Sequence, residues 1–394
     1  MMLNQVYIVS GTRTAIADYG SGLSKYAPTQ LATAVTREAI ERSGIAAGEF
    51  EQAVFGNVLH TEARDMYISR VAAIEAGMPV HSRALTLNRL CGSGLQAIIT
   101  ATQMLQLGDA ATAVAGGAES MTNAGYLLPN LRFGKRMGDA QAIDMMTGVL
   151  TDPFGNGHMG ITAENVAREY GISRDQQDEY ALLSHQRAAT AISSGHFDSQ
   201  ILPLEVNPRR PGKLFRQDEH VRSNPASEDF SSLRPAFERD GTVTPGNASS
   251  LNDGAAAVTL VTEAAVNNLG VKPLARIVAY GHSGVAPEVM GMGPVDAVHQ
   301  VLDRAGLSLT DIDLIESNEA FAAQACAVAS QLDFPAEKVN PNGGAIALGH
   351  PIGATGAILV VKALYELQRT NGRYGLITMC IGGGQGIALI IERQ

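Results

Sequence analysis

Cysteine is scarce in this chain of 394 residues, which has only Cys91, Cys326 and Cys380. An odd number without C-x-x-C spacing argues against a disulfide framework and against a zinc site, so no metal is expected. No apolar run reaches the ~20 residues of a membrane span, and the N-terminus has no basic region or cleavage site of a secretory signal. These absences predict a protein of the reducing cytoplasm without a membrane partner.

Positive charge is also in short supply. Lys and Arg number 29 against 39 Asp and Glu, which gives a formal net charge of −10. Because a phosphate backbone attracts a basic surface, nucleic acid is not expected as a partner. A small anionic ligand held by a few local cations is compatible with this balance. Glycine, by contrast, is abundant at 42 residues and predicts many tight turns and close backbone approaches.

Strands and helices alternate along the first 120 residues, at the rhythm of a layered α/β fold. The rhythm breaks at about residue 121 and resumes near residue 248, after a segment rich in proline and charge. We expect this segment to be an insertion, which commonly forms a binding surface. The apolar patterns predict strands at 6–10, 54–59, 111–115 and 255–261, a turn at 11–14, and helices at 30–43, 67–77, 93–107, 162–170 and 174–194.

The last third of the chain repeats the element order of the first. It has a strand at 276–280 with a turn at 281–284, a helix at 295–305, a strand at 314–318, a helix opening at 349–353 and a strand at 376–380. We expect two related halves, residues 1–270 and 271–394, with the insertion at about 121–248 in the first. Packed about a pseudo-two-fold axis, they would bring Cys91 and His350 face to face at two helix starts, where open α/β sheets bind ligands.

Two cysteines and a histidine lie next to glycines at strand-to-helix turns. Cys91 precedes a helix start, whose dipole favours a thiolate over a thiol. His350 stands between Gly349 and a proline, and Cys380 precedes a run of glycines. Each of these residues alone also suits a packing or capping role. Together they indicate nucleophilic catalysis by a cysteine.

Five stretches resemble the signatures of the thiolase family, in the same order and over essentially the whole chain. They are residues 88–94, 115–121, 318–321, 342–353 and 380–386. The similarity is greatest to the bacterial acetyl-CoA acetyltransferases and the β-ketothiolases of polyhydroxyalkanoate synthesis. The resemblance implies an α/β, thiolase-like fold of two duplicated βαβαβ-type halves with an inserted loop domain, assembled as a homotetramer.

The resemblance also assigns catalytic roles. Cys91 would be the nucleophile that carries the acyl group as a thioester, and His350 would activate it. Cys380 would be the second acid and base, which exchanges a proton with the α-carbon of acetyl-CoA or with the CoA thiol. His350 and a water held by Asn318 would form one oxyanion hole, and the backbone N–H groups of Cys91 and Gly382 would form the other.

Coenzyme A would be a co-substrate, with no permanently bound cofactor. The positions that match substrate or CoA contacts in the family are His158, Met159, Arg222, Phe237, Ser249, Met290, Ala320 and Phe321. Cys326 lies on an apolar helix and is expected to pack.

The implied reaction converts two acetyl-CoA to acetoacetyl-CoA and CoA, reversibly and by a ping-pong mechanism. The main alternative is a 3-ketoacyl-CoA thiolase of fatty acid degradation with a broader chain-length range. Cys380 argues against a decarboxylating ketoacyl synthase, which would use histidines or His and Asn, and against a cysteine hydrolase, which needs no second base. Both cysteines are present, which argues against a non-catalytic acyl-CoA-binding relative.

Overall fold

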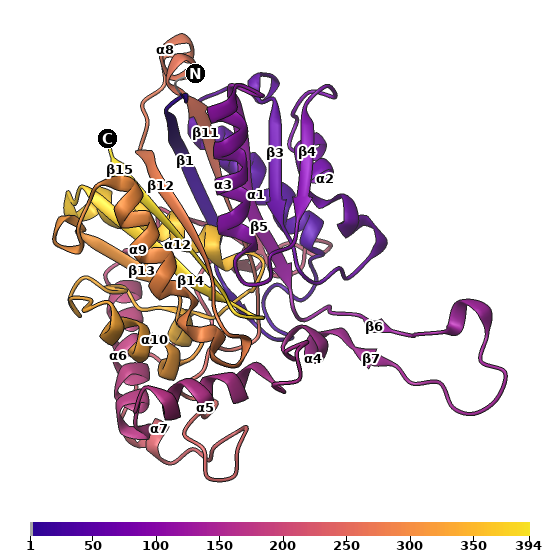
Figure 1. The fold of residues 1–394 in the computed structure, drawn as a ribbon. Helices are drawn as coiled ribbons and strands as arrows, with labels where there is room; N and C mark the ends of the chain where they lie inside the picture. The colour runs from indigo at the N-terminus through magenta and orange to yellow at the C-terminus, as the bar shows by residue number, and fades with distance from the viewer. Residues whose placement is uncertain (1–2) are drawn as a thin grey trace.

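The computed structural model describes residues 3–394, which form two halves and an inserted segment (Figure 1). The first half comprises β1 (Val6–Thr14), β2 (Ala17–Asp18), α1 (Pro28–Ser43), β3 (Gln52–Gly56), α2 (Ile68–Glu75), β4 (Arg83–Leu87), α3 (Ser93–Leu107), β5 (Thr112–Ser120), β11 (Asn252–Thr262) and α8 (Glu263–Leu269). The second half comprises β12 (Ala275–Gly284), α9 (Gly293–Ala305), β13 (Leu314–Ser317), α10 (Ala322–Gln331), α11 (Ala345–Leu348), α12 (Thr355–Thr370), β14 (Tyr374–Ile381) and β15 (Gln385–Arg393).

Both halves have the same strand topology. In the first, β3 is parallel to β5, and β5, β11 and β1 follow in antiparallel order. In the second, β13 is parallel to β14, and β14, β15 and β12 follow in antiparallel order. A short β1–β12 pairing joins them into one sheet of order β13-β14-β15-β12-β1-β11-β5-β3-β4. The duplication expected from the order of the elements is therefore present.

Helices α3 and α12 pack against each other at the junction of the halves, and α12 also contacts β11 of the first half and β14 of its own. Glycines permit this close approach. A Cβ on Gly94 would lie 2.8 Å from the backbone N of Ala357, and one on Gly356 would lie 2.4 Å from that of Leu95. Since each contact is at the start of a helix, the loops that carry Cys91 and His350 are brought together.

Two strands are longer than the sequence predicts, and the turns expected at residues 11–14 and 281–284 are wrong. β1 keeps its pairing with β11 as far as Arg13 and Ala256, and β12 pairs with β15 as far as Gly284 and Gln385. Pairing with a neighbouring strand outweighs the preference of glycine for turns. The helix start expected at 349–353 is also wrong, because these residues form a loop and α12 begins at Thr355.

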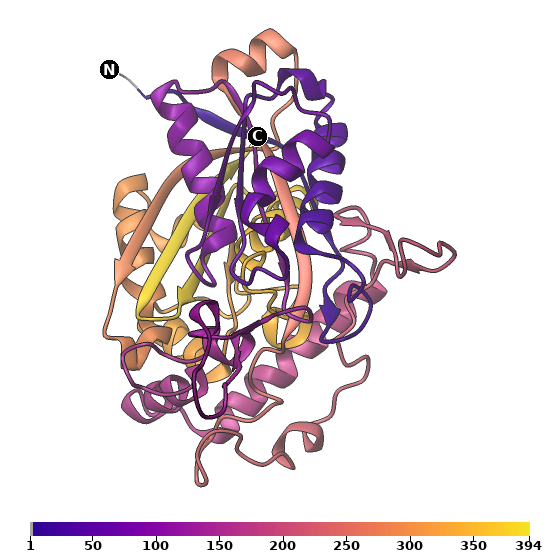
Figure 2. The same ribbon diagram turned by 90° about the vertical axis from the view of Figure 1, so that its right-hand side faces the viewer.

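The insertion separates β5 from β11. In the second half the equivalent connection, between β14 and β15, is only the glycine turn 382–384. The inserted segment contains β6 (Tyr126–Leu127), β7 (Ile143–Asp144), α4 (Met145–Val149), α5 (Met159–Glu169), α6 (Arg174–Ser193), β8 (Ile201–Leu202), β9 (Leu204–Glu205), β10 (Leu214–Phe215) and α7 (Glu228–Ser231). Most of it lies across one end of the sheet (Figure 2), and the β6–β7 arm projects away from the body (Figure 1). Among residues 3–394, no helix is both long and apolar enough to cross a membrane.

Candidate active site

A mainly apolar cavity of about 450 Å³ is bounded by both halves and the inserted segment. Most of the site residues predicted from the sequence contribute to its wall. They are Cys91, His158, Met159, Phe237, Ser249, Met290, Ala320, Phe321, His350, Cys380 and Gly382. The fold therefore gathers side chains from distant parts of the chain around one cavity.

Cys91 lies in a tight loop between β4 and α3. Oδ1 of Asn88 accepts a bond of 2.9 Å from the N–H of Leu90. The hydroxyl of Ser93 donates to the carbonyl of Leu90 at 2.7 Å and accepts from the N–H of Arg89 at 2.8 Å. Leu90 has φ of 48°, in the left-handed region that non-glycine residues rarely adopt. The loop is thus held in a strained conformation that places the Cys91 thiol at the cavity.

Burial opposes the ionisation of the Cys91 thiol. Burial raises its pKa to about 11, and the backbone N–H groups of Gly382 and of Cys91 itself only partly oppose this effect. Desolvation of the charge therefore opposes the thiolate that the helix start was expected to favour. The two N–H groups are those that the thiolase resemblance assigns to an oxyanion hole, and both are directed at the sulfur of Cys91.

His350 is a neutral imidazole oriented by Thr355. Burial lowers its pKa to about 4. Its Nδ1 lies 2.7 Å from Oγ1 of Thr355, whose hydroxyl donates to the carbonyl of Pro351 at 2.9 Å. Because a hydroxyl has one proton, Nδ1 of His350 must be the donor. Its Nε2 consequently carries a lone pair, and this atom has no partner among the residues that the structure describes.

Cys380 is the second thiol of the cavity. It is 1% exposed and is the penultimate residue of β14, which the turn that contains Gly382 follows. Burial raises its pKa, and the charge of an ionised Cys91 raises it further. Cys91 and Cys380 line the same cavity.

Asn318 is fully buried and does not line the cavity. Neither its Oδ1 nor its Nδ2 has a hydrogen-bond partner among the described residues. Asn57 follows β3 as Asn318 follows β13, but its Nδ2 donates to the carbonyl of Ala118 at 2.9 Å and to Glu119 at 3.1 Å. A buried amide with two unbonded atoms is uncommon and suits the binding of an ordered water.

The inserted segment supplies the opposite wall. Nδ1 of His158 accepts from the N–H of Gly160 at 3.0 Å and caps α5, so the proton of its ring is on Nε2. The ring stacks on Phe237 at 4.7 Å, and a Cβ on Gly160 would lie 2.3 Å from Phe237. Ser249 donates from Oγ to the carbonyl of Ala320 at 3.0 Å. These contacts fix an aromatic and polar rim on the apolar cavity.

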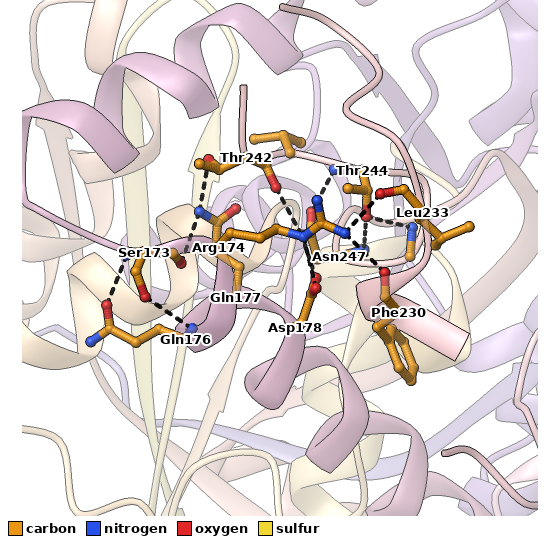
Figure 3. Close-up of polar contacts among 12 residues, drawn as sticks. Ser173, Arg174, Gln176, Gln177, Asp178, Phe230, Leu233, Thr242, Thr244 and Asn247 are labelled. Carbon is orange, nitrogen blue, oxygen red and sulfur yellow. Dashed lines mark hydrogen bonds and ion pairs between the residues drawn. The ribbon is translucent and has the colours of Figure 1, made fainter. Parts of the chain in front are cut away.

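A polar network supports the loop that contains Thr242, Thr244 and Asn247 and precedes Ser249 (Figure 3). Nδ2 of Asn247 donates to Asp178 on α6 at 2.9 Å, and Oδ1 of Asn247 accepts from the N–H of Thr244 at 2.8 Å. Nε of Arg174 donates to the other oxygen of Asp178 at 2.7 Å. The network makes α6 a rigid support for this part of the wall.

Arg222 does not reach the cavity. Its guanidinium lies 4.9 Å above the ring of Phe230, and Nη1 donates to the carbonyl of Asp229 at 3.4 Å. His220, which was not predicted from the sequence, lines the cavity, and its Nδ1 lies 2.9 Å from Oδ1 of Asp18. Its position two residues before Arg222, a predicted CoA contact, is the one feature of the sequence that could have indicated it. No sequence pattern pointed to Thr355, because its role depends on the orientation of His350.

Comparison with known proteins identifies the family of the chain. A model of the N-terminal domain of thiolases matches residues 6–264, and a model of the C-terminal domain matches residues 271–393. The chain is 56% identical to the β-ketothiolase BktB of Cupriavidus necator over the whole of both chains. Among solved structures it is similar to the acetyl-CoA acetyltransferase of Bacillus anthracis, with 42% identity, a TM-score of 0.97 and complete coverage of both chains. It is equally similar to human mitochondrial 3-ketoacyl-CoA thiolase in complex with CoA, with 41% identity and a TM-score of 0.97 over 100% of this chain and 99% of that one. The chain belongs to the thiolase family.

Proposed function

We propose that this protein is an acetyl-CoA C-acetyltransferase, which condenses two acetyl-CoA to acetoacetyl-CoA and CoA reversibly, in a ping-pong mechanism. The observation that carries the proposal is the placement of two thiols, Cys91 and Cys380, with the neutral His350 around one apolar cavity. Relatives named acetyl-CoA acetyltransferase, and one named β-ketothiolase, support it.

The first half-reaction transfers an acetyl group to Cys91. Nε2 of His350 accepts the proton of the Cys91 thiol as its sulfur attacks the thioester carbon of acetyl-CoA. The N–H groups of Cys91 and Gly382 stabilise the oxyanion of the tetrahedral intermediate. The bond from carbon to the CoA sulfur then breaks, and the leaving thiolate takes its proton from Cys380. CoA departs and leaves acetyl-Cys91, an imidazolium at His350 and a thiolate at Cys380.

The second half-reaction forms the carbon–carbon bond. The Cys380 thiolate removes a proton from the α-carbon of a second acetyl-CoA, and His350 together with a water held by Asn318 stabilises the enolate oxygen. The enolate carbon attacks the carbonyl of acetyl-Cys91, and the bond to the Cys91 sulfur breaks. His350 returns its proton to Cys91, so both thiols and the neutral imidazole are restored.

Coenzyme A serves as co-substrate, with no permanently bound cofactor. His158, Met159 and Ser249 would contact its pantetheine arm. The channel would be lined by Phe237, Ala320 and Phe321, and Met290 would bound the acyl pocket. Arg222 would contact the nucleotide outside the cavity.

The specificity is tested by measuring kcat/KM for CoA-dependent thiolysis across 3-ketoacyl-CoA substrates of increasing chain length. We expect the highest value for acetoacetyl-CoA. A higher value for six or more carbons would favour the thiolase of fatty acid degradation. No thiolysis of any member would contradict the proposed function.

We also propose a homotetramer in the cytoplasm. The exposed apolar side chains of the β6–β7 arm support assembly, with Phe133 94% and Met137 86% exposed. All three cysteines are free, which suits a reducing compartment. Light scattering should give four times the mass of the chain, and serine at both Phe133 and Met137 should lower it.

A further inference from the structure

Glu119 and Cys380 occupy equivalent places in the two halves. Glu119 pairs with Gly254 where β5 meets β11, and Cys380 pairs with Gly386 where β14 meets β15. Each residue lies near the end of its strand. Glu119 lies beside the loop that precedes α12 of the second half, and Cys380 lies beside the loop that precedes α3 of the first half. For Cys380 that loop carries Cys91, and the space between them is the active cavity.

In the first half the equivalent space is filled by the carboxylate of Glu119, which is fully buried. Its Oε1 accepts from Nδ2 of Asn57 and the N–H of Leu59, both at 3.1 Å. Its Oε2 accepts from the N–H of Val58 at 3.1 Å and from that of Gly353 at 2.8 Å. All four partners are N–H donors and none accepts a proton, so the geometry suits a carboxylate, although burial raises the pKa of Glu119 to about 8.

The contact with Gly353 crosses from one half to the other. Gly353 belongs to the loop that begins at His350, and a Cβ on it would lie 2.4 Å from Oε2 of Glu119. A Cβ on Gly117 would lie 2.1 Å from the carbonyl oxygen of Gly353, so the loop rests directly on β5. At its other end, the N–H of His350 donates to Oδ1 of Asn252 at 2.8 Å. Two side chains of the first half therefore hold the His350 loop.

We propose that Glu119 is a positioning residue for the reaction proposed above: it fills the first half's counterpart of the active cavity and, through Gly353, fixes His350 against Cys91. Duplication of the fold creates two such spaces. One space holds substrate between Cys380 and Cys91. The other is filled by the carboxylate of Glu119, which orders the loop that begins at His350. The inference rests on the proposed function, because it assigns Glu119 to the acylation of Cys91.

Glu119→Gln tests the inference. A side-chain amide has one acceptor oxygen where a carboxylate has two, so its NH₂ group would face two N–H donors that are left without an acceptor. We expect the acylation of Cys91 by acetyl-CoA and kcat for acetoacetyl-CoA thiolysis to fall about 100-fold, as a misplaced catalytic group does. KM for CoA should stay unchanged, because Phe237 and Ser249 are held by contacts independent of Glu119.

Glu164→Gln is the matched control. Glu164 is a buried carboxylate on α5 that accepts from Thr242 and Val243 within the inserted segment, at 2.8–2.9 Å. The two variants lose comparable buried bonds, so both should have a lower melting temperature. Only Glu119→Gln should slow the acylation of Cys91 in the folded enzyme.

Acylation of Glu119→Gln at the rate of the unchanged enzyme, or a loss no larger than that of Glu164→Gln, would overturn the inference. Should Glu119→Gln fail to fold, Gly353→Ala replaces it, because the added Cβ displaces the loop while the carboxylate stays. It must then give the same fall in kcat at constant KM for CoA. Failure of the unchanged enzyme to acylate Cys91 would instead contradict the proposed function itself.

Discussion

Nδ1 of His350 lies 2.7 Å from the hydroxyl oxygen of Thr355, and this contact determines which imidazole nitrogen can accept a proton. The Thr355 hydroxyl is already committed as a donor to Pro351, so the imidazole must donate from Nδ1. A lone pair is thereby left on Nε2. The orientation of His350, the proposed catalytic base, therefore depends on a residue of α12 that does not line the cavity.

Thr355→Val should slow the acylation of Cys91 by about 10- to 100-fold. The substitution removes the acceptor of the Nδ1 proton, and an unsatisfied buried donor costs about 1–3 kcal/mol, which favours the other tautomer. Thr355→Ser keeps the hydroxyl and should retain most of the rate. Rapid-quench measurement of acetyl-enzyme formation distinguishes the two, and equal rates for both variants would contradict the assigned tautomer.

The alkylation of Cys91 by iodoacetamide should rise with pH without levelling off between pH 7 and pH 10. With a pKa of about 11, the reactive thiolate is a minor species throughout this range, and its fraction increases as the pH rises toward the pKa. Mass spectrometry of the peptide that contains Cys91 gives the rate at this residue alone. A plateau beginning near pH 7 would instead indicate a preformed thiolate–imidazolium pair.

Cys380→Ser should separate the two half-reactions. Acetylation of Cys91 needs Cys380 only to protonate the leaving CoA thiolate, which is a weak base, and should therefore continue. Condensation requires a base for the α-carbon, and a serine hydroxyl is far less acidic than a thiol, so acetoacetyl-CoA formation should be lost. If both steps fell by the same factor, the division of roles between Cys91 and Cys380 would be wrong.

Asn318→Ala and Asn57→Ala should differ in their effect on stability, although the two residues occupy equivalent positions in the halves. The amide of Asn318 makes no bond to a described residue, so its removal should leave the melting temperature nearly unchanged. We expect kcat to fall by about 100- to 1000-fold, as on the loss of an oxyanion-hole group. Asn57→Ala removes bonds to Ala118 and Glu119 and should lower the melting temperature. Assays of kcat and thermal unfolding check both, and destabilisation by Asn318→Ala would contradict the role of that amide.

Local sequence patterns predicted much of the fold. Helix α3 has the bounds expected from its apolar spacing, and α6 differs by one residue, because capping and helical periodicity are local properties. The extensions of β1 and β12 through glycine could not be predicted in this way. They depend on pairing with β11 and β15, which are distant in the sequence.

The candidate site was predictable where the chemistry is carried by the residue type. Cys91, His350 and Cys380 stood out by their neighbours and lie around one cavity. Glu119 gave no signal, because its role arises only when the two halves bring it to Gly353. The burial that raises the pKa of Cys91 could not be predicted, since the packing around the loop cannot be read from one helix start.

The acyl-thioester at Cys91 is the central claim, and intact-peptide mass spectrometry tests it most directly. The enzyme is incubated with acetyl-CoA, quenched in acid and digested, and the cysteine peptides are compared. We predict one acetyl group on the peptide that contains Cys91 and none on those of Cys326 or Cys380, with removal of the group by added CoA. An unmodified Cys91, or acetylation mainly at Cys380, would contradict the account.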